Sequence, residues 1–359
     1  MNKQRIANVV ANMQKEGLDY LIISEPSSID YLIDYVNHPG ERMYVLVLSS
    51  QGNHQLFFNK LFFVADDLGI DITWHSDTDD ATELLAKYIS DAKKVGVDKH
   101  WSANFLLSLM DKLPVVKFVN GSKCVDYVRM VKDETEQKLM IEASKINDLA
   151  MNEVIKLVGT GLTEKQIADH LEEIYKQFGG EGNSFDAIVA FGANGANPHH
   201  ENDDSSLKPG DSVIIDMGCR YQGYCSDMTR TVFYQEISDE AKKVYNLVRQ
   251  ANEAAEAMIK PGVRLCDIDK TARDIITAAG YGKEFNHRLG HFIGKDVHEY
   301  GDVSVNFDLE VKEGMTFSIE PGVYLPGKFG VRIEDLVLVT KDGCKVLNSY
   351  SKDLVVIND

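Results

Sequence analysis

The sequence predicts an α+β protein in two parts, a smaller α/β domain over residues 1–124 and a larger α+β domain over residues 125–359. Three observations support this prediction. Helix and strand patterns alternate through the first part, which is typical of an α/β domain. Residues 155–171 resemble residues 259–275, with Gly161 falling on Gly262 at an offset of 101 positions, and two predicted β-hairpins follow each other at a similar spacing. A chain of 359 residues is long enough for two domains.

The predicted N-terminal domain begins with a helix over residues 5–15, which Gly17 would end because glycine readily adopts the left-handed conformation found after helices. Apolar runs rich in β-branched residues predict strands, and amphipathic patterns predict further helices. Strands are expected at residues 19–24, 41–49, 94–98 and 114–119, and helices at residues 80–92 and 102–111. No glycine-rich phosphate-binding loop follows these strands, so we expect the domain to contribute shape or contact with a second subunit.

The segment NHPGER, residues 37–42, places titratable side chains beside residues that form turns. A solvated turn is the simpler interpretation. A functional loop is the alternative, with His38 as its candidate substrate-binding residue.

The C-terminal domain is predicted to consist of two similar halves. A long helix should begin at Asp133 or Glu134 and run to about residue 157. In the repeated segment, Gly161 aligns with Gly262, and a capping box starts the helix that follows the first of these glycines. Each half therefore has a long helix, a glycine turn and a second amphipathic helix, followed by a hairpin.

The first hairpin, residues 212–233, carries Asp216 and Asp227. If its turn is centred on Tyr221 and Gln222, the two aspartates face each other directly, with Cβ atoms about 4.5–5.5 Å apart. An exposed acidic pair at the edge of a hairpin is one interpretation. The apolar run before Asp216 predicts a buried strand, however, and burial of unpaired acids is costly. The sequence therefore favours a metal site here.

The second hairpin, residues 315–339, repeats this pattern with two glutamates. A loop centred on Gly327 would place Glu320 opposite Glu334. Because two opposed acid pairs occur at matching places of a repeat, chance is a poor explanation. We expect the four carboxylates to meet where the sheets of the two halves join.

Histidines are concentrated in two short loops. His199 and His200 lie in residues 191–202, and residues 285–301 contain the other three, His287, His291 and His298. A single loop histidine is usually solvated. Five of the ten histidines at corresponding stages of a repeat favour a functional role.

Four carboxylates and one imidazole form an oxygen-rich ligand set, unlike the thiolate or all-histidine cages of structural zinc. Two divalent ions would balance four carboxylates, whereas one ion would leave an excess of negative charge. Two ions about 3.5–4 Å apart can hold a bridging water as hydroxide and polarise a carbonyl group. The sequence therefore favours metal-dependent hydrolysis.

The motifs IIDMG, GYCSDMTRT, HRLGHFIG, VHE, FSIEPGVY and VRIED resemble those of the pita-bread metallopeptidases, which include prolidase, aminopeptidase P, methionine aminopeptidase and the metal-free creatinase. The resemblance implies a pita-bread (creatinase/aminopeptidase) fold with a pseudo-twofold repeat, preceded by a smaller creatinase-type α/β domain. It implies two divalent metal ions, with Mn²⁺ preferred and Co²⁺ or Zn²⁺ as alternatives. The implied ligands are Asp216, Asp227, His291, Glu320 and Glu334. Asp227 and Glu334 would bridge the ions, and Glu320 would also be the general base.

The same resemblance implies contacts with substrate. His199 and His298 would lie around the tetrahedral intermediate as catalytic residues, and His200 is the lesser candidate of its pair. Arg288 would bind the free carboxylate of a dipeptide. Arg332 would contact substrate or pair with the acids beside the metals. For both arginines a structural ion pair is the alternative.

The stretch PSSIDYLIDYVNHPGER, residues 26–42, is most similar to bacterial prolidases, in which this loop reaches over the active site of a dimer partner. The resemblance therefore implies a homodimer that hydrolyses Xaa-Pro dipeptides. An aminopeptidase P, which would act on longer Xaa-Pro peptides, is the alternative. A metal-free creatinase-like enzyme or a binding protein is a different class, but such relatives typically have other residues at the ligand positions.

Composition narrows the range of partners. The net charge of −18 argues against a large surface for nucleic acid or anionic membrane, because both need basic patches. The N-terminus lacks the apolar core of a signal peptide, and no apolar run approaches the roughly 18 residues that span a bilayer. We therefore expect a cytoplasmic protein, and the resemblance described above implies a small peptide as its substrate.

Overall fold

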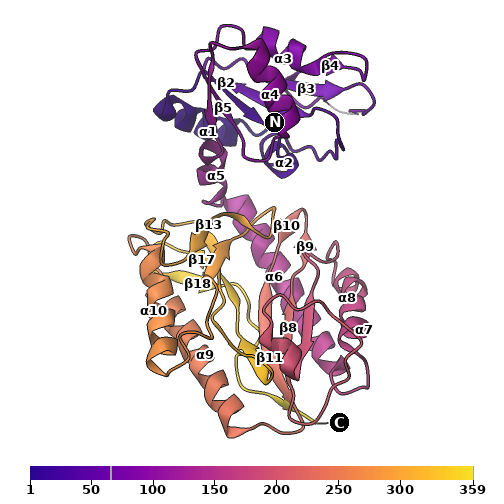
Figure 1. The fold of residues 1–359 in the computed structure, drawn as a ribbon, viewed down its shortest axis with the longest axis vertical. Helices are drawn as coiled ribbons and strands as arrows, with labels where there is room; N and C mark the ends of the chain where they lie inside the picture. Colours follow the sequence, from indigo (N-terminus) through magenta and orange to yellow (C-terminus); the bar gives the residue numbers. More distant parts are fainter. Residues whose placement is uncertain (65–66, 359) are drawn as a thin grey trace. The chain divides into compact units, whose positions relative to one another are not determined.

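A computed structural model describes residues 1–64 and 67–358 and divides into two compact units, Met1–Arg129 and Met130–Asp359 (Figure 1). The first unit has an α/β fold built on one mixed sheet. The second has an α+β fold with a sheet in each half. The predicted fold class is confirmed.

A six-stranded sheet in the order β4-β3-β2-β1-β5-β6 forms the centre of the first unit. Apolar side chains of the sheet pack on one face against α1, α2 and α5, and on the other face against α3 and α4. The strands are β1 Tyr20–Ile23, β2 Val45–Ser49, β3 Gln55–Asn59, β4 Asp71–His75, β5 Lys94–Val97 and β6 Lys117–Asn120. The helices are α1 Lys3–Glu16, α2 Pro26–Ile33, α3 Ala81–Tyr88, α4 Ala103–Lys112 and α5 Lys123–Arg129.

Local sequence explains where these elements begin and end. The Asn2 side chain accepts a hydrogen bond from the backbone of Arg5 and caps α1, and Gly17 ends this helix with φ of 64°, as predicted. The sequence does not predict α2, β3 and β4. Pro26 at the first position of α2 is a start signal that could have revealed this helix.

The second unit begins with α6, Glu134–Val154. The Asp133 side chain accepts hydrogen bonds from the backbone of Thr135 and Glu136, and the Glu136 carboxylate accepts one from the backbone of Asp133. This capping box satisfies amides that would otherwise lack partners at the helix start. The predicted start of the long helix is confirmed.

The predicted repeat appears as matching helical segments. Gly161 and Gly262 have φ of 89° and 90°, a conformation that favours glycine, at equivalent turns of the two halves. The helices of the two halves lie on opposite sides of the strands (Figure 1). They are η1 Ile155–Leu157, α7 Glu164–Asp169 and α8 Leu171–Gln177 in the first half, and α9 Asp239–Met258 and α10 Leu265–Ala278 in the second. Among the described residues, no helix combines the length and apolarity that crossing a bilayer requires.

Each half contributes a sheet, in the orders β19-β11-β8-β7 and β13-β12-β14-β17-β18. Two short hairpins, β9–β10 and β15–β16, extend them. The first-half elements are β7 Ile188–Phe191, η2 Gly192–Ala196, β8 Ser212–Met217, β9 Arg220–Tyr221, β10 Tyr224–Cys225 and β11 Met228–Tyr234. The remaining strands are β12 Gly290–Phe292, β13 Glu299–Val303, β14 Thr316–Ile319, β15 Gly322–Leu325, β16 Phe329–Arg332, β17 Asp335–Val339, β18 Cys344–Val346 and β19 Val356–Ile357.

The register of the first hairpin differs from the predicted one. Asp216 is opposite Thr229, and the two turn residues are Gln222 and Gly223, with φ of 46° and 75°. Two-residue turns with positive φ match the twist of paired strands, so the turn is centred one residue later than predicted. The prediction that Asp216 and Asp227 oppose each other directly is wrong, because Asp227 lies in the break between β10 and β11.

The second hairpin has the predicted register. Its loop is centred on Gly327, with φ of 72°. Glu320 and Glu334 occupy facing positions in the gap between two ladders, whose nearest pairs are Ile319–Asp335 and Gly322–Arg332. The backbone therefore brings these two carboxylates to one place.

Candidate metal centre

Acidic side chains from both halves meet around His291. Atoms of Asp227, His291 and Glu334 all lie within 4.8 Å of one another. The His291 Nε2 atom lies 3.5 Å from Asp227 Oδ2, 3.6 Å from Glu320 Oε1 and 4.0 Å from Glu334 Oε1. Four of the five residues expected from the sequence to bind metal are thus in direct reach of one another.

Asp216 joins this cluster from β8 and is held by an arginine. Its Oδ2 atom accepts a hydrogen bond of 2.6 Å from Nη2 of Arg332, and its charge raises the pKa of Asp227. Arg332 is 3 % exposed and also donates to Thr229 Oγ1 and to the hydroxyl of Tyr324. This geometry fits the second role expected for Arg332, that of a partner for the acids.

Three carboxylate oxygens of the cluster are buried without a hydrogen-bond donor among the residues that the structure describes, namely Asp216 Oδ1, Asp227 Oδ1 and Glu334 Oε1. Leaving buried charged oxygens unpaired is expensive. Arg332 offsets only one of the four carboxylates. The donor set therefore fits hard divalent cations, which bind several carboxylate oxygens.

Burial controls the ionisation of these acids. Burial and the charge of Asp216 raise the pKa of Asp227 well above its ordinary value, and burial with the charge of Asp227 does the same for Glu334. Burial raises the pKa of Glu320 to about 7. A divalent cation would favour the ionised carboxylates and so counteract these shifts.

Hydroxyl groups orient the carboxylates. The Thr229 hydroxyl donates to Glu334 Oε2 over 2.7 Å, and the Ser318 hydroxyl donates to Glu320 Oε1 over 3.2 Å while it accepts the backbone N–H of His291. Such outer partners fix the direction of metal ligands. The sequence analysis missed both hydroxyls, although each lies two residues from a predicted ligand.

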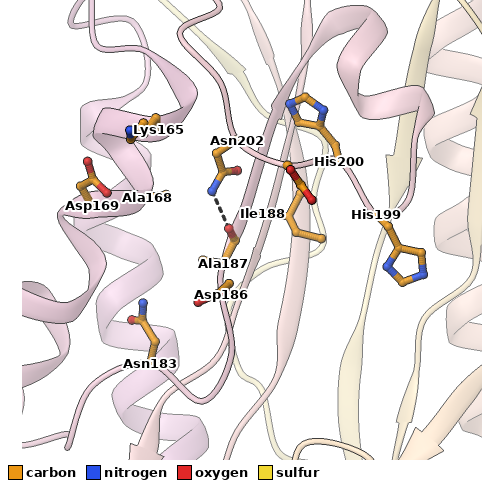
Figure 2. Close-up of a pocket in the computed structure, with 11 residues that line it drawn as sticks. Lys165, Ala168, Asp169, Asn183, Asp186, Ala187, Ile188, His199, His200 and Asn202 are labelled. Atoms are coloured by element: carbon orange, nitrogen blue, oxygen red, sulfur yellow. Dashed lines mark hydrogen bonds between the residues drawn. The ribbon is translucent and has the colours of Figure 1, made fainter.

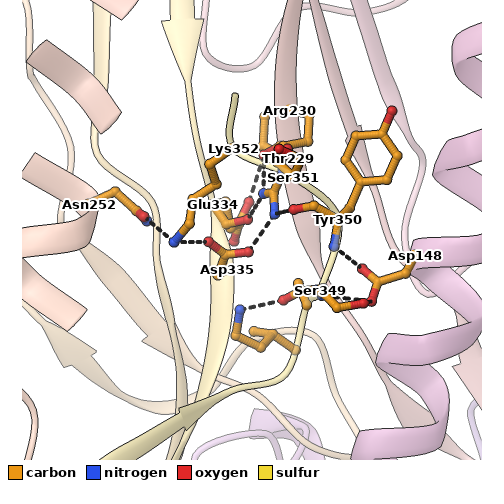
Figure 3. Close-up of polar contacts among 12 residues, drawn as sticks. Asp148, Thr229, Arg230, Asn252, Glu334, Asp335, Ser349, Tyr350, Ser351 and Lys352 are labelled. Atoms are coloured by element: carbon orange, nitrogen blue, oxygen red, sulfur yellow. Dashed lines mark hydrogen bonds and ion pairs between the residues drawn. The ribbon is translucent and has the colours of Figure 1, made fainter. Parts of the chain in front are cut away.

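Arg230 lies beside Glu334 and joins three segments of the chain (Figure 3). It is 2 % exposed, and Nε, Nη1 and Nη2 all donate hydrogen bonds. The acceptors are the Asp335 carboxylate and the backbone carbonyls of Thr229, Glu334, Tyr350 and Ser351. Lys352 also pairs with Asp335, at 2.8 Å. Strands β11 and β17 and the C-terminal segment are therefore tied together directly beside Glu334.

His298 packs against the cluster. Its ring contacts that of His291 edge-on, with centroids 4.3 Å apart. Burial, assisted by the positive charge of nearby groups, lowers the pKa of His298 to about 4. The imidazole is therefore neutral at pH 7.

The neighbouring residues His199 and His200 have different surroundings. His200 Nε2 lies 2.6 Å from Glu164 Oε2, whereas His199 is exposed. Their rings point in different directions beside a pocket of about 490 Å³ (Figure 2). His199 influences the pKa of both His287 and His298, which places it within electrostatic reach of the cluster. Because His200 is engaged elsewhere, His199 is the member of the pair that is open to a ligand.

The two remaining predicted substrate residues differ in what the structure says of them. Arg288 forms an ion pair with Asp302, both partly exposed. Burial lowers the pKa of His291 and of His298, and the charge of Arg288 lowers both further. His38 is exposed in the loop after α2, within the first unit. In the same loop, Arg42 is held by Asp77 through two hydrogen bonds of 2.9 Å.

Residues 138–341 match the family described as "Metallopeptidase family M24", and residues 5–131 match "Creatinase/Prolidase N-terminal domain". The first match covers more than half of the chain. The chain belongs to metallopeptidase family M24. The pita-bread resemblance drawn from the sequence motifs is confirmed. M24 metallopeptidases use divalent metals, and the cluster around His291 supplies candidate ligands.

Individual M24 relatives match along nearly the whole chain. An uncharacterized peptidase of Staphylococcus saprophyticus is 36 % identical over 352 residues, covering 97 % of this chain and 100 % of its own. The prolidase of Thermococcus sibiricus is 34 % identical with a TM-score of 0.91 and 99 % coverage of both chains. The X-Pro aminopeptidase of Thermotoga maritima is 32 % identical with a TM-score of 0.82, covering 96 % of this chain and 100 % of its own.

Proposed function

We propose that this M24 metallopeptidase hydrolyses Xaa-Pro dipeptides with two divalent ions held by Asp216, Asp227, His291, Glu320 and Glu334. Mn²⁺ is the preferred metal of this proposal, with Co²⁺ or Zn²⁺ as alternatives. The observation that carries it is the buried carboxylate cluster with three oxygens that lack a donor among the described residues. Bound cations would pair these oxygens and offset the cost of burying their charge. Similarity to a prolidase over 99 % of the chain supports the choice of substrate.

In the proposed reaction, Glu320 accepts a proton from the attacking water and later releases it. When bound, the metal ions polarise the peptide carbonyl and lower the pKa of water. The Glu320 carboxylate takes the proton of the attacking water as general base. The Glu320 Oε1 atom lies 3.6 Å from His291 Nε2, so this carboxylate is placed inside the cluster to take the proton and to return it to the leaving nitrogen of proline.

The two histidines act as hydrogen-bond partners in this proposal. His298 is neutral at pH 7 because burial lowers its pKa to about 4, so it donates an N–H without losing a proton. An N–H aimed at developing negative charge stabilises the tetrahedral intermediate. His199 approaches the same region from the other half of the fold. Each of these residues would therefore affect rate or substrate affinity more than metal content.

Arg288 is the proposed binding group for the free carboxylate of the dipeptide. Its guanidinium contacts Asp302 through one nitrogen, Nη1. Arginine can bind a carboxylate through two parallel N–H groups, so its other nitrogens suit a second anion. The proposal extends to a homodimer in which residues 37–42, including His38, form a lid over the site of the partner and exclude longer peptides.

Aminopeptidase P activity is the second candidate, supported by the similarity to an X-Pro aminopeptidase. The two functions are separated by comparing kcat/KM for an Xaa-Pro dipeptide, the same dipeptide as its C-terminal amide, and an Xaa-Pro-Yaa-Zaa peptide. We expect the dipeptide to be cleaved fastest. Arg288→Met should raise KM for the dipeptide about tenfold or more and leave the amide unchanged, because one charged hydrogen-bonding pair is worth roughly 1.5–3 kcal/mol.

Faster cleavage of the longer peptide would reject the dipeptidase proposal in favour of aminopeptidase P. An equal effect of Arg288→Met on the dipeptide and its amide would show that Arg288 does not bind the carboxylate. Asp308→Asn, which alters an exposed arginine–aspartate pair of this unit, is the control and should change the cleavage of neither substrate.

A further inference from the structure

The segment that carries His199 has little regular structure of its own. After η2 ends at Ala196, no helix or strand is formed until β8 begins at Ser212. His199 is exposed within this segment. An exposed histidine in irregular backbone needs other contacts to hold its position, because loop backbone is mobile by default.

Glu164, in the first turn of α7, supplies such contacts. Its side chain is completely buried. One carboxylate oxygen accepts the backbone N–H of Phe191 at 2.7 Å and the side-chain N–H of Asn194 at 2.9 Å. The other pairs with His200 Nε2 at 2.6 Å and accepts the backbone N–H of Asp203 at 3.2 Å. A single carboxylate therefore grips the segment on both sides of His199.

Glu164, His200 and Asp203 also lie close enough together to hold a cation. The hydrogen bonds argue against that use. Both oxygens of Glu164 already accept bonds from backbone and side-chain N–H groups, and the close contact with His200 Nε2 requires a proton between the two atoms. Each oxygen already has two N–H partners, so a metal could bind Glu164 only by displacing at least one of them. We therefore interpret Glu164 as a residue that holds the chain in place through hydrogen bonds.

Asn202 and Gly195 make further contacts that fix the chain on either side of His199. The Asn202 amide bonds to the backbone of Val189 and Ala187 on and beside β7, the second bond being visible in Figure 2. Gly195 packs directly on Gly330 of β16, where an added Cβ on Gly330 would lie 1.8 Å from the Gly195 carbonyl oxygen. The segment is thus pressed against the half that supplies Glu320 and Glu334.

We propose that Glu164 is a positioning residue that holds His199 at the metal centre by fixing the chain on both sides of it. The inference rests on the proposed function, in which His199 contacts the reacting peptide. Glu164 touches neither metal nor substrate. Its contribution to the rate is therefore exerted through His199 alone, and it disappears when the His199 side chain is absent.

A double-mutant cycle tests this dependence. Glu164→Gln keeps the volume of the side chain. Its amide NH₂ group replaces one carboxylate oxygen and cannot accept the hydrogen bonds that this oxygen accepts. We expect this substitution to lower kcat/KM for an Xaa-Pro dipeptide about tenfold to a hundredfold, the same range as for residues that orient metal ligands, with metal content unchanged. In the His199→Ala background it should have no further effect. In the His298→Ala background it should have its full effect. Glu173→Gln, an exposed position on α8, is the matched control and should behave as wild type.

Glu164→Gln removes a buried carboxylate, so His200→Asn provides a milder second variant that loses one of the four bonds. It should lower kcat/KM less and also have no effect once His199 is replaced. Equal losses in the wild-type and His199→Ala backgrounds would overturn the proposal. Loss of bound metal in Glu164→Gln, or full activity of His199→Ala, would overturn it as well.

A readout without turnover separates this inference from the proposed function. The His199 imidazole NMR signal should be distinct in the wild type and shift toward that of a solvated histidine in Glu164→Gln. An unchanged His199 signal would overturn the positioning role whether or not Xaa-Pro dipeptides are cleaved. A wild type that cleaves no Xaa-Pro peptide would reject the function and leave the NMR test valid.

Discussion

Asp227→Asn is expected to lose bound divalent metal and to reduce turnover of Xaa-Pro dipeptides by about a thousandfold or more. Asp227 is buried, its Oδ2 atom lies 3.5 Å from His291 Nε2, and its Oδ1 atom has no donor among the described residues. An amide cannot supply the negative charge that bridges two cations. Metal ions contribute several kcal/mol to transition-state stabilisation, and each 1.36 kcal/mol is a factor of ten in rate. Metal content after dialysis and kcat measure both effects.

The control for this variant is His298→Ala. It should retain both metal ions and lose mainly rate or substrate affinity, because His298 contacts the ring of His291 and is not among the proposed ligands. Full activity of Asp227→Asn would disprove the bridging role. Loss of metal in both variants would mean that the histidine contributes to metal binding.

Arg230→Met is expected to lower the free energy of unfolding by about 3–5 kcal/mol, the cost of breaking a buried ion pair from one side. The substitution leaves Asp335, which is fully buried, without its 2.7 Å partner Arg230 and removes the arginine hydrogen bonds to four backbone carbonyl groups. Lys352 also contacts Asp335 and reduces the loss without replacing the hydrogen bonds. Urea unfolding in the presence of a chelator measures the effect without a contribution from metal binding.

Arg249→Met is the matched control. Arg249 also pairs with two acids, but its side chain is 34 % exposed. Exposed ion pairs contribute about 0–1 kcal/mol, so we expect a small change. Equal decreases in the free energy of unfolding for the two substitutions would show that the buried hydrogen bonds of Arg230 stabilise the fold no more than exposed ion pairs do.

The sequence predicts most of the architecture because its signals are local. The helix end at Gly17, the helix start at Asp133 and the glycine turns at Gly161 and Gly262 each depend on a few neighbouring residues, and the structure has them where they are predicted. The short elements α2, β3 and β4 are not predicted, because segments of five to eight residues carry too little periodicity to separate them from loops.

Hairpin register depends on a single turn residue. Gly327 marks the centre of the second hairpin, so the facing positions of Glu320 and Glu334 follow from the sequence. In the first hairpin the turn contains Gln222, which takes positive φ although glutamine seldom does. The sequence therefore predicts a turn centre one residue too early. Asp216 faces Thr229 across the ladder, and Asp227 lies in the break between β10 and β11.

The supporting contacts of the site could not be predicted in this way. Glu164 is 27 residues before Phe191 in the chain, and Arg230 is 104 residues before Glu334, whose carbonyl accepts its bond. Tertiary packing, within the first half for Glu164 and between the two halves for Arg230, brings such residues together. Residue types can suggest metal ligands, whereas partners of those ligands require a three-dimensional structure.

Anomalous diffraction from crystals saturated with Mn²⁺ tests the central claim most directly. The account predicts two peaks about 3.5–4 Å apart, the usual spacing of paired catalytic metals, bound by Asp216, Asp227, His291, Glu320 and Glu334. A single peak, or none beside these side chains at saturating Mn²⁺, would contradict it.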